Sequence, residues 1–261
     1  MIVAGILSSI LQAKRREAQA LNSPAGRRAM EEKLRRAPAP RGFVAALKSK
    51  GGFRIIAEMK RASPSLGTIA AEYDPARLAT EYEAGGAAAL SVLTDRPYFK
   101  GDPGDLETAC SSCSLPVLRK DFIVEDCQVE ESRALGADAL LLIAALLDLA
   151  ALRRLRSLSE SLGMAALVEV HDAEDLSKAL ASGATLVGVN NRDLSTFEVS
   201  LDVSLALAPS MPAGVVRVSE SGIASRRDLV RLAGAGYDAF LVGEALMKSG
   251  DRRALLQEWL A

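Results

Sequence analysis

The chain is poor in aromatic residues, in histidine and in cysteine, and each shortage excludes a class of protein. Aromatics make up 4% of its 261 residues and His171 is the single histidine, so the core must be built mainly from Leu, Val, Ile and Ala. The three cysteines, Cys110, Cys113 and Cys127, are too few and too odd in number for a disulfide framework. Cys110 and Cys113 have C-x-x-C spacing without a second pair. This favours buried or incidental thiols over a metal or redox site. It also predicts that the protein resides in the reducing cytoplasm.

Neither sign of charge dominates, and no apolar run is long enough to cross a membrane. The formal net charge of −1 argues against binding to nucleic acid or to a membrane surface through bulk electrostatics. The longest apolar stretch, 137–152, is interrupted by Asp138 and Asp148 and is shorter than the ~18 residues of a spanning helix. The apolar residues 1–11 precede Lys14-Arg15-Arg16, the reverse of the charge order in a signal peptide. We therefore expect a cytoplasmic protein without nucleic-acid or membrane partners.

From about residue 53 onward, a short apolar run alternates with an amphipathic helix. Continuous apolar runs are typical of strands buried on both faces of a parallel sheet. Eight such units predict an α/β fold of the (β/α)8, or TIM, barrel type, since a doubly wound sheet usually has fewer strands. The expected strands are 54–59, 87–93, 116–119, 138–143, 165–169, 185–189, 214–218 and 238–242.

Residues 1–52 precede the predicted barrel at 53–261 and have a different pattern. Residues 2–20, 24–34 and 43–48 are predicted to be helical, and Ala37-Pro38-Ala39-Pro40 interrupts them. We interpret the segment as a helical extension packed on the barrel rather than an interaction tail or a separate domain.

Five of the expected strands end in an ionisable or amide side chain. In a (β/α)8 barrel these ends meet at one mouth, where active sites lie. Buried charges are costly unless they are paired or used, and a pocket with two lysines and three glutamates can hold both acids and bases. A simple ion pair that closes the barrel top is the structural alternative for the first strand, but the other strands supply more charge than one pair requires. The residues are Glu58 with Lys60, Lys120, Glu169, Asn190 and Glu220.

Glycine-containing loops follow the last two expected strands, and they indicate a phosphate site. Gly222 and Gly243 each precede a predicted helix start, where backbone N–H groups favour anions. Ordinary turn glycines are the alternative. Lys60, Arg61 and Arg192 offer positive charge.

Other side chains at the same end of the barrel have less specific roles. Ser63 could add a hydroxyl from the first loop, and Phe99 and Phe122 stand in loops where they could hold an aromatic ring. His171, just past Glu169, is interpreted as a surface or capping residue rather than as a base.

Seven ordered segments carry a family resemblance, beginning with Glu58-Met59-Lys60-Arg61-Ala62-Ser63-Pro64-Ser65 and ending with Ser219-Glu220-Ser221-Gly222-Ile223. The segments between them are 91–95 with 98–101, 118–123, 136–139, 167–171 and 189–194. The chain resembles the indole-3-glycerol-phosphate synthase family of tryptophan biosynthesis over nearly its whole length, including the N-terminal extension.

The resemblance implies a lyase that closes the pyrrole ring of 1-(2-carboxyphenylamino)-1-deoxyribulose 5-phosphate with loss of CO2 and water, without a metal or organic cofactor. It assigns Lys120 as the general acid of ring closure, Glu169 as the general base and Lys60 as the acid of dehydration. Other positions would orient these groups and bind substrate hydroxyls: Glu58, Asn190 and Glu220. The phosphate would lie at Ser63, Ser221, Gly222 and Gly243, and the aromatic ring at Phe99, Phe122, Arg192 and Leu194.

Two positions depart from the family pattern. Glu244 places a negative charge beside the expected phosphate, so its side chain would have to turn away, and Cys127 stands where an aromatic is common. Phosphoribosylanthranilate isomerase is the nearest enzymatic alternative, but it uses one acid–base pair, often Cys and Asp. A catalytically silent phosphosugar-binding barrel is the other alternative, and it would lack the lysines. We expect a monofunctional enzyme of a small phosphorylated substrate, monomeric or weakly dimeric.

Overall fold

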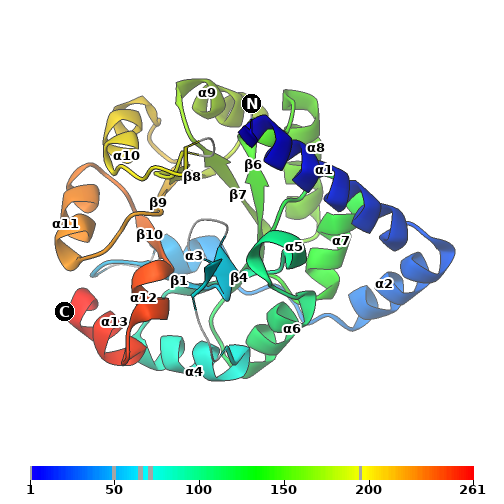
Figure 1. The fold of residues 1–261 in the computed structure, drawn as a ribbon, viewed down its shortest axis with the longest axis horizontal. Coiled ribbons are helices and arrows are strands. Elements are labelled where there is room, and N and C mark those ends of the chain that lie inside the picture. Colours follow the sequence, from blue (N-terminus) through cyan, green and yellow to red (C-terminus); the bar gives the residue numbers. More distant parts are fainter. Residues whose placement is uncertain (1, 49–50, 64–66, 70–72, 194–195) are drawn as a thin grey trace.

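A closed barrel of eight parallel strands forms the centre of the protein (Figure 1). The computed structural model describes residues 2–48, 51–63, 67–69, 73–193 and 196–261. Each expected strand is found within two residues of its predicted bounds, and β1 closes the barrel by pairing with both β4 and β10. The (β/α)8 prediction is therefore confirmed. The strands are β1 (Ile55–Met59), β4 (Ala89–Leu93), β5 (Val117–Lys120), β6 (Ala139–Ile143), β7 (Ala165–Val170), β8 (Leu186–Asn190), β9 (Val216–Glu220) and β10 (Ala239–Val242).

Helices surround the barrel as an outer ring (Figure 1), and their ends are set by local signals. Asp74 accepts hydrogen bonds from the first turn of α4, and Gly86 ends that helix with a φ of 90°. Asp172 and Gly183 do the same for α9. The main helices are α4 (Pro75–Gly85), α6 (Pro103–Ser112), α7 (Asp126–Ala134), α8 (Leu149–Ser161), α9 (Ala173–Ser182), α10 (Asp202–Leu207), α11 (Arg226–Gly234) and α13 (Arg252–Leu260). Shorter elements lie in the connections: the β2–β3 hairpin (Ala62–Ser63 and Gly67–Thr68), α5 (Arg96–Phe99), η1 (Ala144–Leu146), η2 (Ala208–Ser210) and α12 (Glu244–Lys248).

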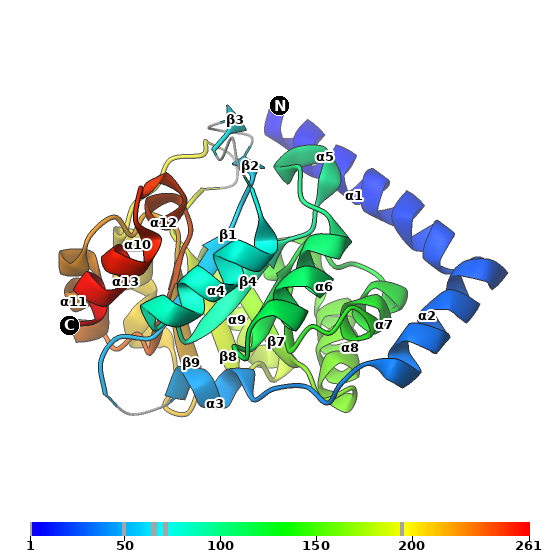
Figure 2. The same cartoon turned by 90° about the horizontal axis from the view of Figure 1, so that it is seen from below.

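The N-terminal segment forms the three predicted helices, α1 (Ile2–Leu21), α2 (Pro24–Arg36) and α3 (Phe43–Lys48). The first two lie against the outside of the barrel beside α7, where Arg27 pairs with Glu130 at 2.5 Å (Figures 1 and 2). Helix α3 lies under the end of the barrel where the strands begin (Figure 2), and Phe43 and Leu47 pack on the barrel interior.

The interior-facing side chains are apolar in the lower part of the barrel and charged at its mouth, where the strands end. Successive side chains point to opposite faces, so every second residue faces the interior. On β5 and β7 the apolar Leu118 and Leu167 belong to the interior cluster, and Lys120 and Glu169 follow them two residues later at the strand ends. The same alternation places Glu58 two residues after Ile56. Within the part of the chain that the structure describes, no helix combines the length and the apolar character needed to cross a bilayer.

Candidate active site

Lys120 lies between two carboxylates at the mouth of the barrel. Its Nζ is 2.9 Å from Glu169 Oε2 and 2.9 Å from Glu220 Oε2, and its side chain is 16% exposed. Burial alone would lower the pKa of this ammonium, but the charges of Glu169, Glu220 and Glu58 more than offset it and raise the pKa. Lys120 is therefore a protonated donor in a mostly dry site.

The pKa values of the two carboxylates beside Lys120 are shifted in opposite directions. Burial favours the neutral form of both. For Glu169 this is outweighed by Lys120, by His171 and by a hydrogen bond from Asn190, so its pKa is lowered. For Glu220, burial and the nearby negative charges of Glu169 and Glu58 raise the pKa in spite of Lys120. Neighbouring groups with pKa values pushed apart provide an acid and a base at the same pH.

The second lysine forms its own pair at the end of β1. Lys60 Nζ lies 2.9 Å from Glu58 Oε1, and both side chains are largely buried. The ion pair considered as an alternative is therefore present, beside the Lys120 cluster rather than instead of it. A Cβ on Gly243 would lie 2.5 Å from the same Glu58 oxygen. Gly243 thus makes room for Glu58 in addition to bordering the predicted phosphate site.

Gly188, within β8, was not predicted as a site residue. A Cβ at this position would collide with Glu220 Oε1. An isolated glycine inside an apolar strand indicates a close approach by another group, and Val187-Gly188-Val189 carries that signal.

The side chain of His171 is largely buried, which contradicts a surface position, but its backbone N–H donates to Asp175 in the first turn of α9, in keeping with a capping role. Its side chain is 13% exposed, with Nε2 3.4 Å from Glu169 Oε1 and Nδ1 3.5 Å from Asp175 Oδ2. Burial would lower the pKa of His171, but Asp175 and Glu169 raise it overall. The ring therefore links the predicted base to a second carboxylate on α9.

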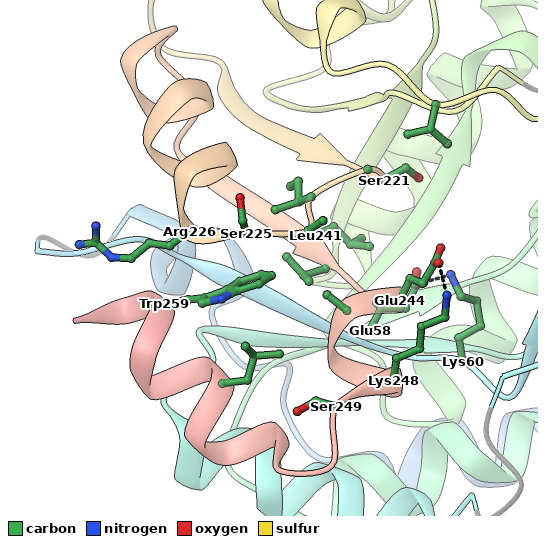
Figure 3. A pocket seen from close by; sticks show the side chains of 18 of the residues that line it. Glu58, Lys60, Ser221, Ser225, Arg226, Leu241, Glu244, Lys248, Ser249 and Trp259 are labelled. Carbon is green, nitrogen blue, oxygen red and sulfur yellow. Dashed lines mark hydrogen bonds and ion pairs between the residues drawn. The ribbon is translucent and has the colours of Figure 1, made fainter.

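The pocket at the ends of β9 and β10 has a volume of about 1060 Å³ and lies beside Lys60 (Figure 3). Ser221 and Gly222 line it in left-handed backbone conformations, with φ values of 67° and 80°. A serine in this region is strained, and such residues cluster at functional sites. Asn191 Nδ2 donates to the Ser221 carbonyl at 3.0 Å and fixes the turn.

The charges around this pocket differ from the prediction at two positions. Glu244 lines the pocket and does not turn away from it: it pairs with Lys248 at 2.6 Å and lies 3.9 Å from Arg192 (Figure 3). Arg61 does not join Lys60. It stacks on the Tyr73 ring at 4.5 Å and lies 3.6 Å from Asp105, because neighbouring residues of an extended chain point to opposite sides.

The two predicted aromatic side chains are neighbours on the other side of the mouth. The ring centroids of Phe99 and Phe122 are 6.3 Å apart. Phe99 ends the short helix α5 rather than standing in an irregular loop, and Phe122 follows β5. Around the closed barrel, β5 lies opposite β9, whereas β4 is separated from β10 only by β1. Leu194 and the side chain of Ser63 lie outside the described residues.

The cysteines are not grouped with other potential ligands. Cys110, Cys113 and Cys127 are free, and burial raises the pKa of Cys110 to about 12. In the ranges that the structure describes, no three His, Cys, Asp or Glu side chains are arranged to hold a metal ion.

Comparison with known proteins identifies the family. The family model described as "Indole-3-glycerol phosphate synthase" matches residues 7–259. An indole-3-glycerol phosphate synthase of Mycolicibacterium vanbaalenii is 48% identical over 255 residues, which cover 98% of this chain and 93% of the relative. One of Aromatoleum aromaticum is 49% identical, covering 95% and 96%.

A solved structure gives an independent likeness of the fold alone. It is a thiamine phosphate pyrophosphorylase from Pyrococcus furiosus with a TM-score of 0.59 and 16% identity, and the match covers 79% of this chain and 93% of that one. With the family model spanning nearly the whole chain and relatives close to half identical, the chain belongs to the indole-3-glycerol phosphate synthase family.

Proposed function

We propose that the chain converts 1-(2-carboxyphenylamino)-1-deoxyribulose 5-phosphate to indole-3-glycerol phosphate, CO2 and water. Family membership supports the reaction. The observation that carries the residue roles is the position of Lys120, a protonated donor held by Glu169 and Glu220 between the pocket at the ends of β9 and β10 and an aromatic pair.

The substrate lies across the mouth of the barrel. Its phosphate binds at the β9 and β10 loops, where Ser221, Gly222 and Gly243 supply backbone and Lys60 and Arg192 supply charge. Its carboxyphenyl ring lies toward Phe99 and Phe122, which follow β4 and β5, and β5 is the strand opposite β9. This pose places the ketone between the two ends, above Lys120.

In ring closure, the ring carbon that bears the carboxylate attacks the ketone carbon. The carbonyl π electrons move to oxygen, and Lys120 delivers a proton to the developing alkoxide. Loss of CO2 from the same ring carbon then returns its bonding pair to the ring and restores aromaticity.

In dehydration, Lys60 protonates the departing hydroxyl and Glu169 removes the proton whose loss completes the pyrrole. The two steps are coupled through charge. The low pKa of Glu169 depends on the Lys120 ammonium, so Glu169 becomes a stronger base once Lys120 has given up its proton. Glu58, Asn190 and Glu220 orient these groups.

The test is turnover of the synthetic substrate, followed as the appearance of indole fluorescence. We expect Lys120→Ala to lower kcat/KM by about 10³-fold or more, the range of general acid catalysis, with an unchanged circular dichroism spectrum. Lys33→Ala, which removes an exposed lysine paired with Glu107 on the outside of the barrel, is the matched control. Near-normal activity of Lys120→Ala would refute its assignment as the acid. Binding without turnover by the unmodified protein would favour the silent phosphosugar-binding barrel.

The remaining proposals come from the sequence. They are a single functional unit made of the extension at 1–52 and the barrel at 53–261, a monomeric or weakly dimeric state, a cytoplasmic location, and partners limited to the phosphorylated substrate.

A further inference from the structure

The ammonium group of Lys14, on α1, is buried between the extension and the barrel. Its Nζ lies 2.8 Å from Asp121 Oδ1, 2.9 Å from Asp95 Oδ1 and 3.0 Å from Glu17 Oε2. The side chains of Lys14 and Asp95 are each 1% exposed. Burial would lower the pKa of Lys14, but Asp121 and Asp95 raise it, so the group is charged.

Each of the two buried aspartates fixes one of the active-site aromatics. Asp95 is the N-cap of α5 and accepts hydrogen bonds from the backbone N–H of Tyr98 at 2.8 Å and of Phe99 at 3.3 Å. Asp121 Oδ1 accepts a hydrogen bond from the backbone N–H of Phe122 at 2.8 Å. The two carboxylates that pair with Lys14 therefore fix the backbone at Phe99 and at Phe122.

The two aspartates depend on Lys14 to different degrees. Asp121 Oδ2 also has Arg119 Nη2 at 3.2 Å and accepts a hydrogen bond from Thr94. Removal of the Lys14 ammonium would therefore leave the charge of Asp95 less compensated than that of Asp121. The position of α5, and with it that of Phe99, would be affected most. Removing one partner of a buried ion pair is strongly destabilising because the other charge is left uncompensated.

We propose that Lys14 is a positioning residue for the aromatic end of the active site. One ammonium from outside the barrel fixes the loop after β4 relative to the loop after β5, and so sets the distance between Phe99 and Phe122. This inference rests on the proposed function, in which these rings flank the carboxyphenyl group of the substrate. It gives the N-terminal extension a part in substrate recognition.

The test compares Lys14→Met with Arg41→Met. Methionine keeps most of the length of lysine without its charge. Arg41 is the matched control because it too joins the extension to a buried aspartate, with Nε 2.9 Å from Asp138 Oδ2, but Asp138 precedes β6 at the opposite end of the barrel. Both variants should lower Tm by roughly 5–15 °C.

At a temperature well below both transitions, Lys14→Met should raise KM at least tenfold with a smaller fall in kcat, and Arg41→Met should leave KM within twofold. An unchanged KM in Lys14→Met, or an equal rise in both variants, would overturn the proposal. If Lys14→Met does not fold, Asp95→Asn replaces it in the same test, because asparagine still caps α5 but lacks the charge that pairs with Lys14. It should raise KM in the same way, and an unchanged KM would count equally against the proposal.

Hydrogen exchange gives a readout that does not depend on catalysis. The amides of Tyr98 and Phe99 should exchange faster in Lys14→Met, or in Asp95→Asn, than in Arg41→Met. Equal protection in these variants would overturn the positioning role even if the unmodified protein failed to turn over the substrate. That failure alone would refute the proposed function instead.

Discussion

Glu220 Oε1 occupies the space that a side chain at Gly188 would need. The two residues belong to the adjacent strands β9 and β8, and the missing side chain lets the carboxylate fold down beside Lys120. A residue without chemistry of its own therefore shapes the most charged part of the site.

Gly188→Ala should displace the Glu220 carboxylate and lower kcat by about tenfold to a hundredfold. Overpacking of this kind also costs about 1–3 kcal/mol of stability. Gly234→Ala is the control, because a Cβ there meets no atom within 4 Å. Kinetics and thermal melts of both variants check the prediction, and normal kcat in Gly188→Ala would contradict it.

Glu169→Gln should lower kcat much more than Glu220→Gln. Glu169 has a lowered pKa and serves as the ionised base, so its amide variant should lose about 10²–10⁴-fold in kcat. Glu220 has a raised pKa, and its amide resembles the protonated form, so the loss should be roughly tenfold or less. Steady-state kinetics decides between the roles, and a larger loss for Glu220→Gln would reverse them.

The raised pKa of Glu220 also predicts how stability depends on pH. The folded protein binds this proton more tightly than the unfolded chain, whose carboxyl titrates near 4.5. The stabilisation is complete below that pH and is lost as pH rises through the folded pKa. Glu220→Gln should flatten this part of the profile, measured as Tm against pH. A profile parallel to that of the unmodified protein would contradict the prediction.

His171→Gln should reveal a similar dependence at higher pH. The pKa of His171 is raised above its ordinary 6.5, because Asp175, Glu169 and Glu220 together outweigh burial. The stability that it contributes is therefore complete below pH 6.5 and disappears as pH rises through its folded pKa. Each unit of pKa difference corresponds to about 1.4 kcal/mol. The Tm difference between the two proteins should shrink from pH 6 to pH 8.5, whereas a constant difference would indicate a neutral ring.

Glu244→Gln should strengthen substrate binding. It removes a negative charge from the phosphate pocket and releases Lys248 and Arg192 to face the anion. Two unit charges 4 Å apart interact by about 1 kcal/mol in water, so KM should fall about two- to fivefold at low salt, with kcat unchanged. A rise in KM would mean that Glu244 holds the two cations in place for the phosphate.

The strands and the charged mouth could be predicted because each depends on local sequence. Parallel barrel strands are short apolar runs, and helix ends carry residues such as Asp74 and Gly183. Residues two apart share a face, so Glu58 and Lys60 were correctly placed together. The same rule places the side chain of Arg61 on the other face, where it contacts Tyr73 and Asp105.

The contacts across long sequence separations could not be predicted in this way. In the sequence, Lys14 stands in a basic run with Arg15 and Arg16, which are exposed. Its true setting is the buried stripe of α1 between Ile10 and Ala18, spaced four residues apart. A lysine within such a stripe signals a buried partner, but not which carboxylate. The position of His171 likewise depends on Glu169, Asp175 and the packing around them.

The ion pairs of α1 have a consequence for the folding of the substrate-binding end. Lys14 is far in sequence from its acceptors Asp95 and Asp121, which follow β4 and β5. These are non-local contacts, and such contacts form slowly because closing a long loop costs entropy. We therefore expect the aromatic side of the mouth to become ordered only after β4 and β5 have joined the barrel.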